Sequence, residues 1–260
     1  MKLRGKTAVV TAASRGLGRG IALRFAQEGA RLFIASRSEE AIRRAAEDIR
    51  GQTGAEVAWM AADVSRKDDV DRLLAAIRET YGTADILVNN AGGPPAGMFF
   101  DLDDEAWQKA FDLNLMSVVR MTRGIVPMMK ERGGGRIINI ISYSIKQPIP
   151  GLVLSNAMRA AVAGLTKTLS MELAPHGILV NGLGPGRILT DRIRELDIAA
   201  AARRGVTPEQ AAAEAEAGIP LGRSGTVEEF AGAALFLASD DGAYVNGQML
   251  IVDGGMTRTY

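Results

Sequence analysis

The sequence KTAVVTAASRGLGRGIALRFAQEG, residues 6–29, decides how the rest of the chain can fold. Its apolar run at residues 7–10 is short enough for one buried strand, and a turn of small residues follows at 11–18. Apolar side chains then recur at helical spacing from Leu17 to Phe25, until a glycine ends the pattern. The stretch therefore predicts a buried strand, a tight turn and a helix.

The turn is suited to a phosphate group. The first residues of a helix leave N–H groups unpaired at the positive end of the helix dipole, and these groups attract an anion. Gly16 and Gly18 would let the backbone approach the pyrophosphate of a dinucleotide. Many glycine-rich turns have only a structural role, so this prediction depends on the strand and the helix that flank the turn.

The same alternation continues to the end of the chain. We predict further strands at residues 32–35, 57–61, 85–88, 136–141, 178–183 and 248–252, and helices at 38–50, 67–81, 103–132, 155–174 and 227–238. Apolar strands that alternate with helices are typical of a parallel sheet with helices on both faces. The predicted fold class is α/β, a Rossmann-type doubly wound parallel sheet in a single domain over residues 1–260. An Ala-rich, charged insertion at residues 187–222 is expected to be helical and to act as a lid.

The composition excludes several classes of protein. The formal net charge is only +1, which gives no reason to expect a nucleic acid or a membrane surface as partner. The chain has no cysteine and therefore no disulfide, thiolate metal site or thiol nucleophile, and we predict no metal site. No apolar run approaches the roughly 18 residues of a membrane span, and the first residues lack the layout of a signal peptide. We expect a soluble, cytoplasmic protein.

Six short motifs follow one another along the chain. They are Thr11-Ala12-Ala13-Ser14-Arg15-Gly16-Leu17-Gly18, Asp63-Val64, Asn89-Asn90-Ala91-Gly92, Asn114, Pro185-Gly186 with Thr190, and Val252-Asp253-Gly254-Gly255. In order and spacing they resemble the motifs of the short-chain dehydrogenases/reductases. Within that family the chain looks most like the 3-oxoacyl-carrier-protein reductase group. The resemblance covers nearly the whole chain.

The resemblance implies a nicotinamide dinucleotide cofactor and a set of residues that bind it. These are Ser14, Arg15, Gly16, Leu17, Gly18, Arg37, Asp63, Val64, Asn90, Ala91, Gly92, Pro185, Gly186, Ile188 and Thr190. One position departs from the family pattern, because Ala12 stands where the family has a glycine. Alanine is costly where the backbone needs a positive φ. We therefore expect a slightly altered turn that still binds the cofactor through its two remaining glycines.

A second departure concerns the catalytic residues. The family has a serine at the end of the fifth strand, and then a tyrosine and a lysine, spaced YxxxK, at the start of the next helix. Ser142 matches the serine, and Asn114 matches the family's active-site asparagine. Residues 160–162, AAV, match the triplet that follows the lysine, so Ser155 stands in place of the tyrosine and Arg159 in place of the lysine. We take these four residues as the catalytic set.

Reduction of a ketone needs a group that delivers a proton to the carbonyl oxygen. A serine hydroxyl is a far weaker acid than a tyrosine, whose reference pKa is about 10. An arginine, with a pKa above about 12, stays protonated and relays protons poorly, although Arg159 can bind ribose hydroxyls or polarise Ser155. Tyr143 and Lys146 follow Ser142 and are the obvious substitutes for the missing acid. We favour the interpretation in which Tyr143 lines the substrate pocket and Lys146 is solvated.

The residues after the second strand indicate which dinucleotide is bound. A site for NAD usually has a carboxylate there, which binds the ribose hydroxyls. This chain instead has Ser36 and Arg37 at that place, with Arg15 in the turn. Two guanidinium groups without a carboxylate suit a 2′-phosphate. We therefore predict NADP as the cofactor, with NAD as the less favoured choice.

Two functions from different classes fit these residues. The first is an NADP(H)-dependent oxidoreductase, similar to 3-oxoacyl reductases, that acts on a small-molecule carbonyl or a secondary alcohol, with an acyl thioester among the candidates. The alternative is a nucleotide-binding protein of the same fold with little or no turnover, which the missing tyrosine and lysine favour. A related reaction, such as an epimerisation or an elimination, stays open as a third option.

The pocket and the assembly are less determined by the sequence. An apolar substrate pocket is indicated by Pro94, Pro95, Met98, Ile149 and Leu152. Arg187, Arg192 and Arg194 could attract an acidic substrate, but we favour surface charge for all three. The two long helices predicted at residues 103–132 and 155–174 carry more apolar surface than they need to cover one face of a sheet. Since such helices pair across a two-fold axis in the family, we predict a homotetramer with D₂ symmetry.

Overall fold

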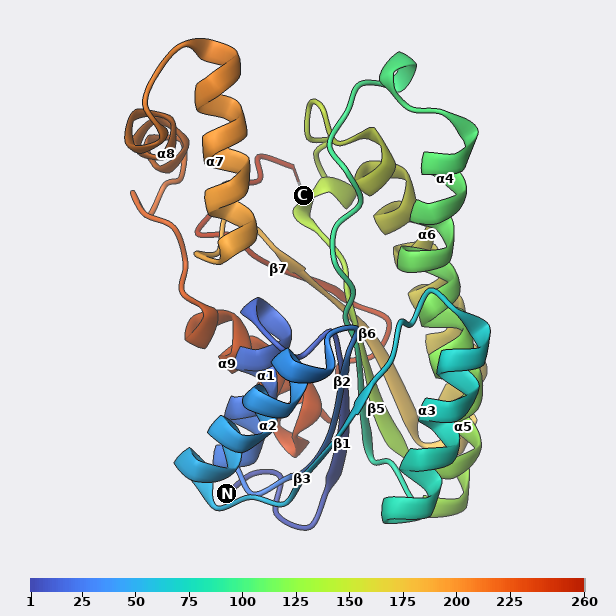
Figure 1. The fold of residues 1–260 in the computed structure, drawn as a ribbon. Coiled ribbons are helices and arrows are strands. Elements are labelled where there is room, and N and C mark those ends of the chain that lie inside the picture. Colours follow the sequence, from blue (N-terminus) through green and yellow to red (C-terminus); the bar gives the residue numbers. More distant parts are fainter. Residues whose placement is uncertain (260) are drawn as a thin grey trace.

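The computed structural model describes residues 1–259, and its centre is a parallel sheet of seven strands (Figure 1). The strands are β1 (Thr7–Thr11), β2 (Arg31–Ser36), β3 (Val57–Ala61), β4 (Ile86–Asn89), β5 (Gly135–Ile140), β6 (Ile178–Pro185) and β7 (Met249–Val252). Their order across the sheet is β3-β2-β1-β4-β5-β6-β7. The order reverses between β1 and β4, which is where sheets of this type bind ligands. The predicted fold class is confirmed.

Helices cover both faces of the sheet (Figure 1). One layer consists of α1 (Gly16–Gln27), α2 (Glu39–Thr53) and α9 (Val227–Ala238), and the other of α3 (Lys67–Tyr81), α4 (Asp104–Phe111), α5 (Ser117–Arg132) and α6 (Val153–Leu173). Two further helices, α7 (Asp191–Arg204) and α8 (Pro208–Ala217), project beyond the edge of the sheet at which its strands end. The predicted helical character of the insertion at residues 187–222 is thereby confirmed.

The first strand shows why both layers form. Ala8 and Val10 pack into the core under α1, α2 and α9, whereas Val9 packs into the core on the α3 and α5 side. Successive side chains of a strand point to opposite faces, so a strand that is covered on both faces must be apolar throughout. All three side chains are fully buried, as the uninterrupted apolar run predicts.

The predicted strands and helices are confirmed in type and order. Some of their boundaries differ, and one predicted helix is interrupted by an irregular segment. The helix predicted from residue 155 begins at Val153, and the sixth strand extends to Pro185 because Pro185 is still in register with Val252 of β7. The predicted helix at 103–132 is not regular, since a π-helical segment, Asp112–Met116, joins α4 to α5. Such segments are frequent at functional sites, and this one carries Asn114.

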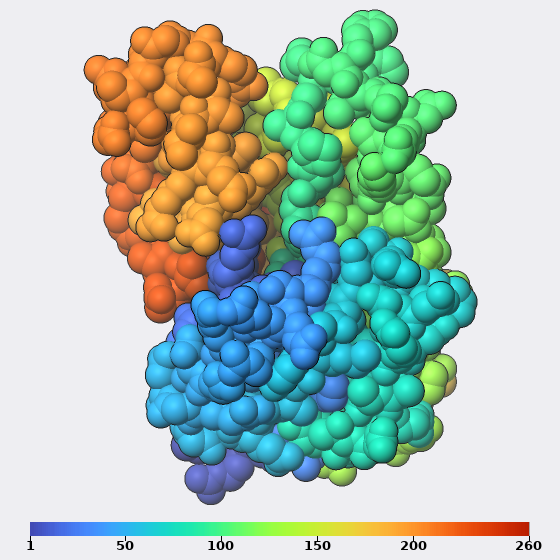
Figure 2. Space-filling view, in the orientation of Figure 1, coloured from blue at the N-terminus to red at the C-terminus, as the bar shows by residue number. Residues whose placement is uncertain are grey.

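A cleft lies at the carboxyl ends of the strands of the sheet. In Figure 2 the surface is hollowed between the lid helices, drawn in orange, and the green segment that follows β4. This cleft corresponds to a cavity of about 400 Å³ whose walls include Ala96, Leu152 and Leu196. None of the predicted catalytic or cofactor-binding residues lines this cavity, but the turns that carry the motifs lie at the same edge of the sheet, because parallel strands all end there.

Candidate active site

The turn after β1 has the conformation that its glycines predict. Gly16 has φ +57°, and a Cβ at Gly18 would lie 2.5 Å from the Ala12 carbonyl oxygen and 2.7 Å from Asn90 Nδ2. Ala12 itself has φ +48°, and among the described residues it alone has a positive φ without being glycine. The turn thus keeps the backbone of a glycine-containing motif, and the alanine is strained there by about 1–2 kcal/mol. The expectation of an altered turn is not supported.

The end of β1 is tied to the end of β4. The Thr11 hydroxyl donates to the Asn90 carbonyl oxygen at 2.6 Å and accepts from the Asn90 N–H at 2.9 Å. Asn90 Nδ2 donates in turn to the Ala12 carbonyl oxygen at 3.3 Å. Hydrogen bonds in both directions fix the distance between the two loops. The sequence placed Asn90 in the site but did not single out the hydroxyl of Thr11.

The first turn of α1 fits a phosphate. No side chain caps it, since the N-cap residue Arg15 makes no side-chain cap hydrogen bond, and no acidic residue stands in the first turn. The free N–H groups and the helix dipole therefore remain available to an anion. Thr190, at the start of α7, lies against this turn, because a Cβ at Gly16 would be 3.7 Å from the Thr190 methyl carbon. Ser14 and Leu17 are half-buried in the same turn.

The residues predicted to choose the cofactor surround the end of β2. Arg37 is exposed and makes no ion pair with any of residues 1–259. Arg15 is exposed as well and lies 3.9 Å from Asp191 of α7. At the end of β3, Asp63 Oδ1 accepts from both the N–H and the hydroxyl of Ser65, at 3.0 and 2.7 Å. The residue directly after β2 is thus a cation, Arg37, whereas a carboxylate, Asp63, stands after β3.

Arg159 is the most buried charge of the site. Only 6% of its surface is exposed, and Nη1 donates to the Ile140 carbonyl oxygen at 2.7 Å while Nη2 lies 3.5 Å from the Ala91 carbonyl oxygen. Burial lowers the pKa of Arg159 to about 10, whereas we expected a pKa above about 12. The guanidinium still carries its charge at neutral pH, between the ends of β4 and β5.

Asn114 leaves a buried polar atom without a partner. Its Nδ2 donates to the Gly92 carbonyl oxygen at 2.9 Å, and its Oδ1 has no hydrogen bond with the described residues although the residue is only 1% exposed. A buried acceptor without a donor is costly. Asn114 Oδ1 is therefore a place where a water, a cofactor or a substrate group would be bound.

Three successive carbonyl groups after β4 are held by side chains. Thr11 holds that of Asn90, Arg159 approaches that of Ala91, and Asn114 holds that of Gly92. The backbone of this motif is thus fixed by three different elements, β1, α6 and the π-helical segment.

The two serines come from different segments, Ser142 from the loop after β5 and Ser155 from the start of α6. Ser142 follows β5, and its Oγ accepts from the N–H of Ser144 at 3.1 Å, which leaves its own proton for another acceptor. Ser155 is half-buried, one helical turn before Arg159 on α6, and its hydroxyl bonds to none of residues 1–259. Residues four apart share one helix face. Ser155 and Arg159 therefore face the same side of α6.

Tyr143 is half-buried next to Ser142. Burial raises the pKa of its hydroxyl above the usual value, and the charge of Arg187 opposes this shift. The less favoured alternative was that Lys146 lowers this pKa, and the charges that act on Tyr143 are those of Arg187 and Asp253. Lys146 is exposed, and its backbone carbonyl accepts from the Thr259 hydroxyl at 3.4 Å.

The segment after β6 connects the sheet to the lid. Gly186 has no room for a side chain, because a Cβ there would lie 2.3 Å from the Asp253 Cβ. Pro185 ends β6, and Ile188 is buried and bridges to Gly225. The VDGG motif thus acts through close packing against the segment that the resemblance assigns to the cofactor.

Arg187 is not the surface charge that we expected. Its side chain is only 10% exposed, and its Nη1 and Nη2 bind both carboxylate oxygens of Asp197 on α7 at 2.8 and 2.7 Å. Its Nε donates to the Ser224 hydroxyl at 3.0 Å, and that hydroxyl donates to Glu216 of α8 at 2.6 Å. This network joins both lid helices to the end of β6. Arg192 and Arg194 are exposed, as we expected.

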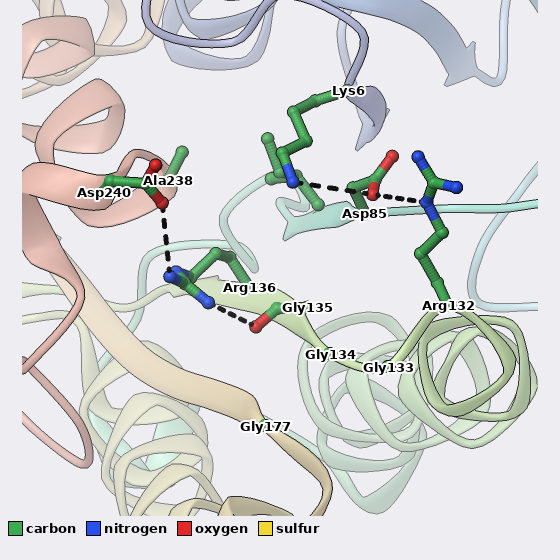
Figure 3. Close-up of a pocket in the computed structure, with 11 residues that line it drawn as sticks. Lys6, Asp85, Arg132, Gly133, Gly134, Gly135, Arg136, Gly177, Ala238 and Asp240 are labelled. Carbon is green, nitrogen blue, oxygen red and sulfur yellow. Dashed lines mark hydrogen bonds and ion pairs between the residues drawn. The ribbon is translucent and has the colours of Figure 1, made fainter.

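A second cavity, of about 410 Å³, lies at the other end of the sheet, where its strands begin (Figure 3). There Lys6 and Arg132 approach Asp85 Oδ1 at 4.0 and 3.4 Å, and Arg136 lies 3.8 Å from Asp240. Asp85 also accepts from the N–H of Thr7 at 2.8 Å, so it ties the start of β1 to the start of β4. None of the predicted site residues lines this cavity.

Within residues 1–259, no three side chains of His, Asp or Glu lie close enough together to hold a metal ion. In the same part of the chain, no helix combines the length and the apolar character that crossing a membrane requires.

Comparison with known proteins gives concordant matches. A family model described as Enoyl-(Acyl carrier protein) reductase matches residues 11–257. The 3-oxoacyl-[acyl-carrier-protein] reductase FabG of Chlamydia muridarum is 39% identical over 96% of this chain and 97% of its own length. The human dehydrogenase/reductase SDR family member 4 is 36% identical over 97% of this chain and 88% of its own. The solved structure of L-sorbose reductase from Gluconobacter frateurii, complexed with NADPH and L-sorbose, covers both chains fully at 35% identity with a TM-score of 0.95.

Proposed function

Because the chain belongs to the short-chain dehydrogenase/reductase family, we propose that it is an NADPH-dependent oxidoreductase that acts on a carbonyl or a secondary alcohol. One observation carries the proposal: the buried guanidinium of Arg159 joins the ends of β4 and β5, and Asn114, which binds the next carbonyl group after β4, has an oxygen that lacks a partner among the described residues. A buried cation and an unsatisfied acceptor at the mouth of a dinucleotide-binding sheet support chemistry there.

The described residues fit the cofactor. The uncapped first turn of α1 would hold the pyrophosphate, and Arg37 and Arg15 would hold a 2′-phosphate. Asp63 and Val64 would border the adenine, and the segment from Pro185 to Thr190 would cover the nicotinamide. NADPH, when bound, supplies the hydride. The NADPH in the sorbose reductase structure supports this choice of dinucleotide.

The residues of the chain divide the remaining work. Ser142 has its proton free to donate to the substrate oxygen, because its Oγ already accepts from the Ser144 N–H. Arg159 places a positive charge where negative charge develops on that oxygen. Ser155, on the same face of α6, orients the substrate oxygen or a water. Proton delivery then falls to a water in the cleft or to Tyr143, since serine is too weak an acid to replace a tyrosine efficiently.

A second function is favoured by a specific observation. Arg159 already donates to the Ile140 carbonyl at 2.7 Å, so its position is also that of a structural residue. A protein that binds NADPH without turning over a substrate would have the same cofactor residues. The two functions differ only in whether bound NADPH is consumed.

The test measures NADPH binding by calorimetry and NADPH oxidation with a panel of ketones. Wild-type protein should bind NADPH and reduce generic ketones slowly. Changing Ser155→Tyr and Arg159→Lys together should raise turnover by up to the roughly 10²–10⁴-fold that general acid catalysis contributes. Tyr143→Phe should abolish the wild-type reaction if Tyr143 is the acid and leave it unchanged if Tyr143 only lines the cleft. Tight NADPH binding without turnover in any variant would establish the second function.

Three finer points belong to the same proposal. The FabG relative is named for a substrate attached to acyl carrier protein, which makes an acyl thioester one candidate substrate. A homotetramer and a cytoplasmic location follow from the family resemblance and from the composition, respectively.

A further inference from the structure

The cavity between the lid and the loops below it is apolar along most of its wall. Ile149 and Leu152, from the loop before α6, face Leu196, Ala200 and Ala211 of the two lid helices. Leu152 directly precedes the helix that carries Ser155 and Arg159. The candidate catalytic residues do not themselves line the cavity, but Leu152 places one of its walls three residues before Ser155, so the cavity would hold the part of a substrate that does not react.

Three guanidinium groups line this cavity, and two of them are already paired. Arg187 binds Asp197 through two hydrogen bonds at 2.8 and 2.7 Å. Arg204 is paired with Glu214 across the two lid helices. The two carboxylates that line the cavity, Asp197 and Glu214, are thus each paired with an arginine that also lines it.

Arg203 is the third guanidinium, and it has no partner among the described residues. It forms neither an ion pair nor a hydrogen bond with residues 1–259. It nevertheless reaches across the cavity, because a Cβ at Gly151 in the opposite loop would lie 3.6 Å from Arg203 Nη1. Three cations against two carboxylates leave the wall of the cavity with one uncompensated positive charge.

We propose that Arg203 binds a carboxylate at the far end of the substrate. The substrate would then be a carbonyl compound, or the corresponding alcohol, whose apolar chain runs through the cavity and ends in a carboxylate. A guanidinium binds a carboxylate with two parallel hydrogen bonds. A single carboxylate also matches the one uncompensated charge, whereas a phosphate monoester carries nearly two. This inference rests on the proposed function, since it assigns the reacting end of the substrate to the site beside Arg159.

The test compares methyl ketones of increasing chain length that end either in a carboxylate or in the matching primary amide. Their binding to the protein saturated with NADP⁺ is measured by calorimetry, so that no turnover is needed. We expect one chain length at which the acid binds at least about tenfold more tightly than its amide, as a charge-assisted hydrogen bond implies. Arg203→Gln should remove this difference, and Arg203→Lys should retain part of it.

A matched control is available on the same helix. Arg194 is exposed, its side chain pairs with Asp191 alone among residues 1–259, and it does not line the cavity, so Arg194→Gln should keep the preference for the acid. Equal binding of acid and amide in the wild type, or an equal loss in both variants, would overturn the inference. Tighter binding of a phosphate-terminated ketone than of the carboxylate would overturn the choice of carboxylate.

Kinetics separate this inference from the proposed function. If the protein reduces neutral ketones but neither prefers the acid nor responds to Arg203→Gln, the oxidoreductase stands and the inference is wrong. If the acid binds in the presence of NADP⁺ and depends on Arg203, but no ketone is reduced with NADPH, the inference stands and the oxidoreductase is wrong.

Discussion

Arg159 combines a full charge with almost complete burial. Placing a charge in a low-dielectric interior is unfavourable unless hydrogen bonds replace the lost water. The carbonyl groups of Ile140 and Ala91 provide such partners at the end of the sheet. Because burial lowers the pKa of Arg159 to about 10, its charge is lost at a lower pH than that of an exposed arginine.

The pH dependence of catalysis should report this residue. If the charge of Arg159 stabilises the developing oxyanion, kcat/KM for a ketone should be level from neutral pH upward and fall as pH rises through about 10. The protonated form is the active one, so rate is lost on its deprotonation. A profile in which kcat/KM rises through that range would contradict this assignment.

Tyr143 is the control for this profile. Burial raises its pKa above the usual value, so Tyr143 should still be protonated where Arg159 begins to lose its proton. If the Tyr143→Phe variant retains activity, its kcat/KM should therefore still fall as the pH rises through about 10. Its disappearance would assign the titration to the tyrosine.

Arg37 should decide between the two dinucleotides. It is exposed at the end of β2 and has no carboxylate partner within residues 1–259, so it is available to a 2′-phosphate. Arg37→Ala should weaken NADPH binding by about 1–3 kcal/mol, the range for hydrogen bonds to charged groups, and leave NADH binding nearly unchanged. Calorimetric titration with both dinucleotides measures this, and equal affinity of the wild type for both would disprove the prediction.

At the scale of elements, a buried chain of polar side chains runs along one face of the sheet, from α5 over β4 and β5 to α6. Asn89 of β4 donates to the Thr122 hydroxyl of α5 at 3.1 Å and to Asn139 of β5 at 2.8 Å. Asn139 donates in turn to the Thr166 hydroxyl of α6 at 2.8 Å. All four residues are buried. The chain thus fixes β4 and β5, which carry the site residues, relative to the helices beside them.

Replacing the middle of this chain should be costly. Asn139→Leu would remove one hydrogen bond from Asn89 and one from Thr166, although Asn89 still donates to Thr122 and Thr166 to the Val162 carbonyl oxygen. Since each buried hydrogen bond contributes about 0.5–1.5 kcal/mol, we expect the free energy of unfolding in urea to fall by about 1–3 kcal/mol. Thr122→Val removes only one hydrogen bond and should cost less. Equal stability of Asn139→Leu and the wild type would show that the chain contributes nothing.

At the scale of the whole molecule, large apolar side chains remain exposed on both helix layers. Phe111 of α4 and Met171 of α6 are 36% and 64% exposed, and Phe236 of α9 and the adjacent Tyr244 are 38% and 103% exposed. β7 is also an edge strand with no neighbour on its outer side. Exposed apolar patches and open strand edges are typical of surfaces that bind other chains.

The prediction of a homotetramer with D₂ symmetry belongs to this scale. Light scattering at micromolar concentration should give the mass of four chains. The family resemblance implies a second interface formed by the last strand and the helix before it, β7 and α9. Phe236→Asp would place a charge in that interface and should yield dimers, whereas Arg194→Gln should leave the mass unchanged. A monomeric wild type would contradict the prediction.

The sequence by itself determined the fold and the location of the site. Apolar runs of strand length and helical periodicity are local properties, and parallel strands necessarily bring the ends of their motifs to one edge. The position of Gly18 was predictable for the same reason, because the space for its side chain is closed by Ala12, a few residues away in the same turn.

Only the tertiary structure decided which charges are buried and which are free. Arg187 and Arg203 look alike in the sequence, yet Arg187 is paired with Asp197 under the lid and Arg203 has no partner within residues 1–259. The strain at Ala12 and the unpartnered oxygen of Asn114 were likewise not readable from the residue order. Each of these states depends on contacts between segments far apart in the chain, and local periodicity carries no information about such contacts.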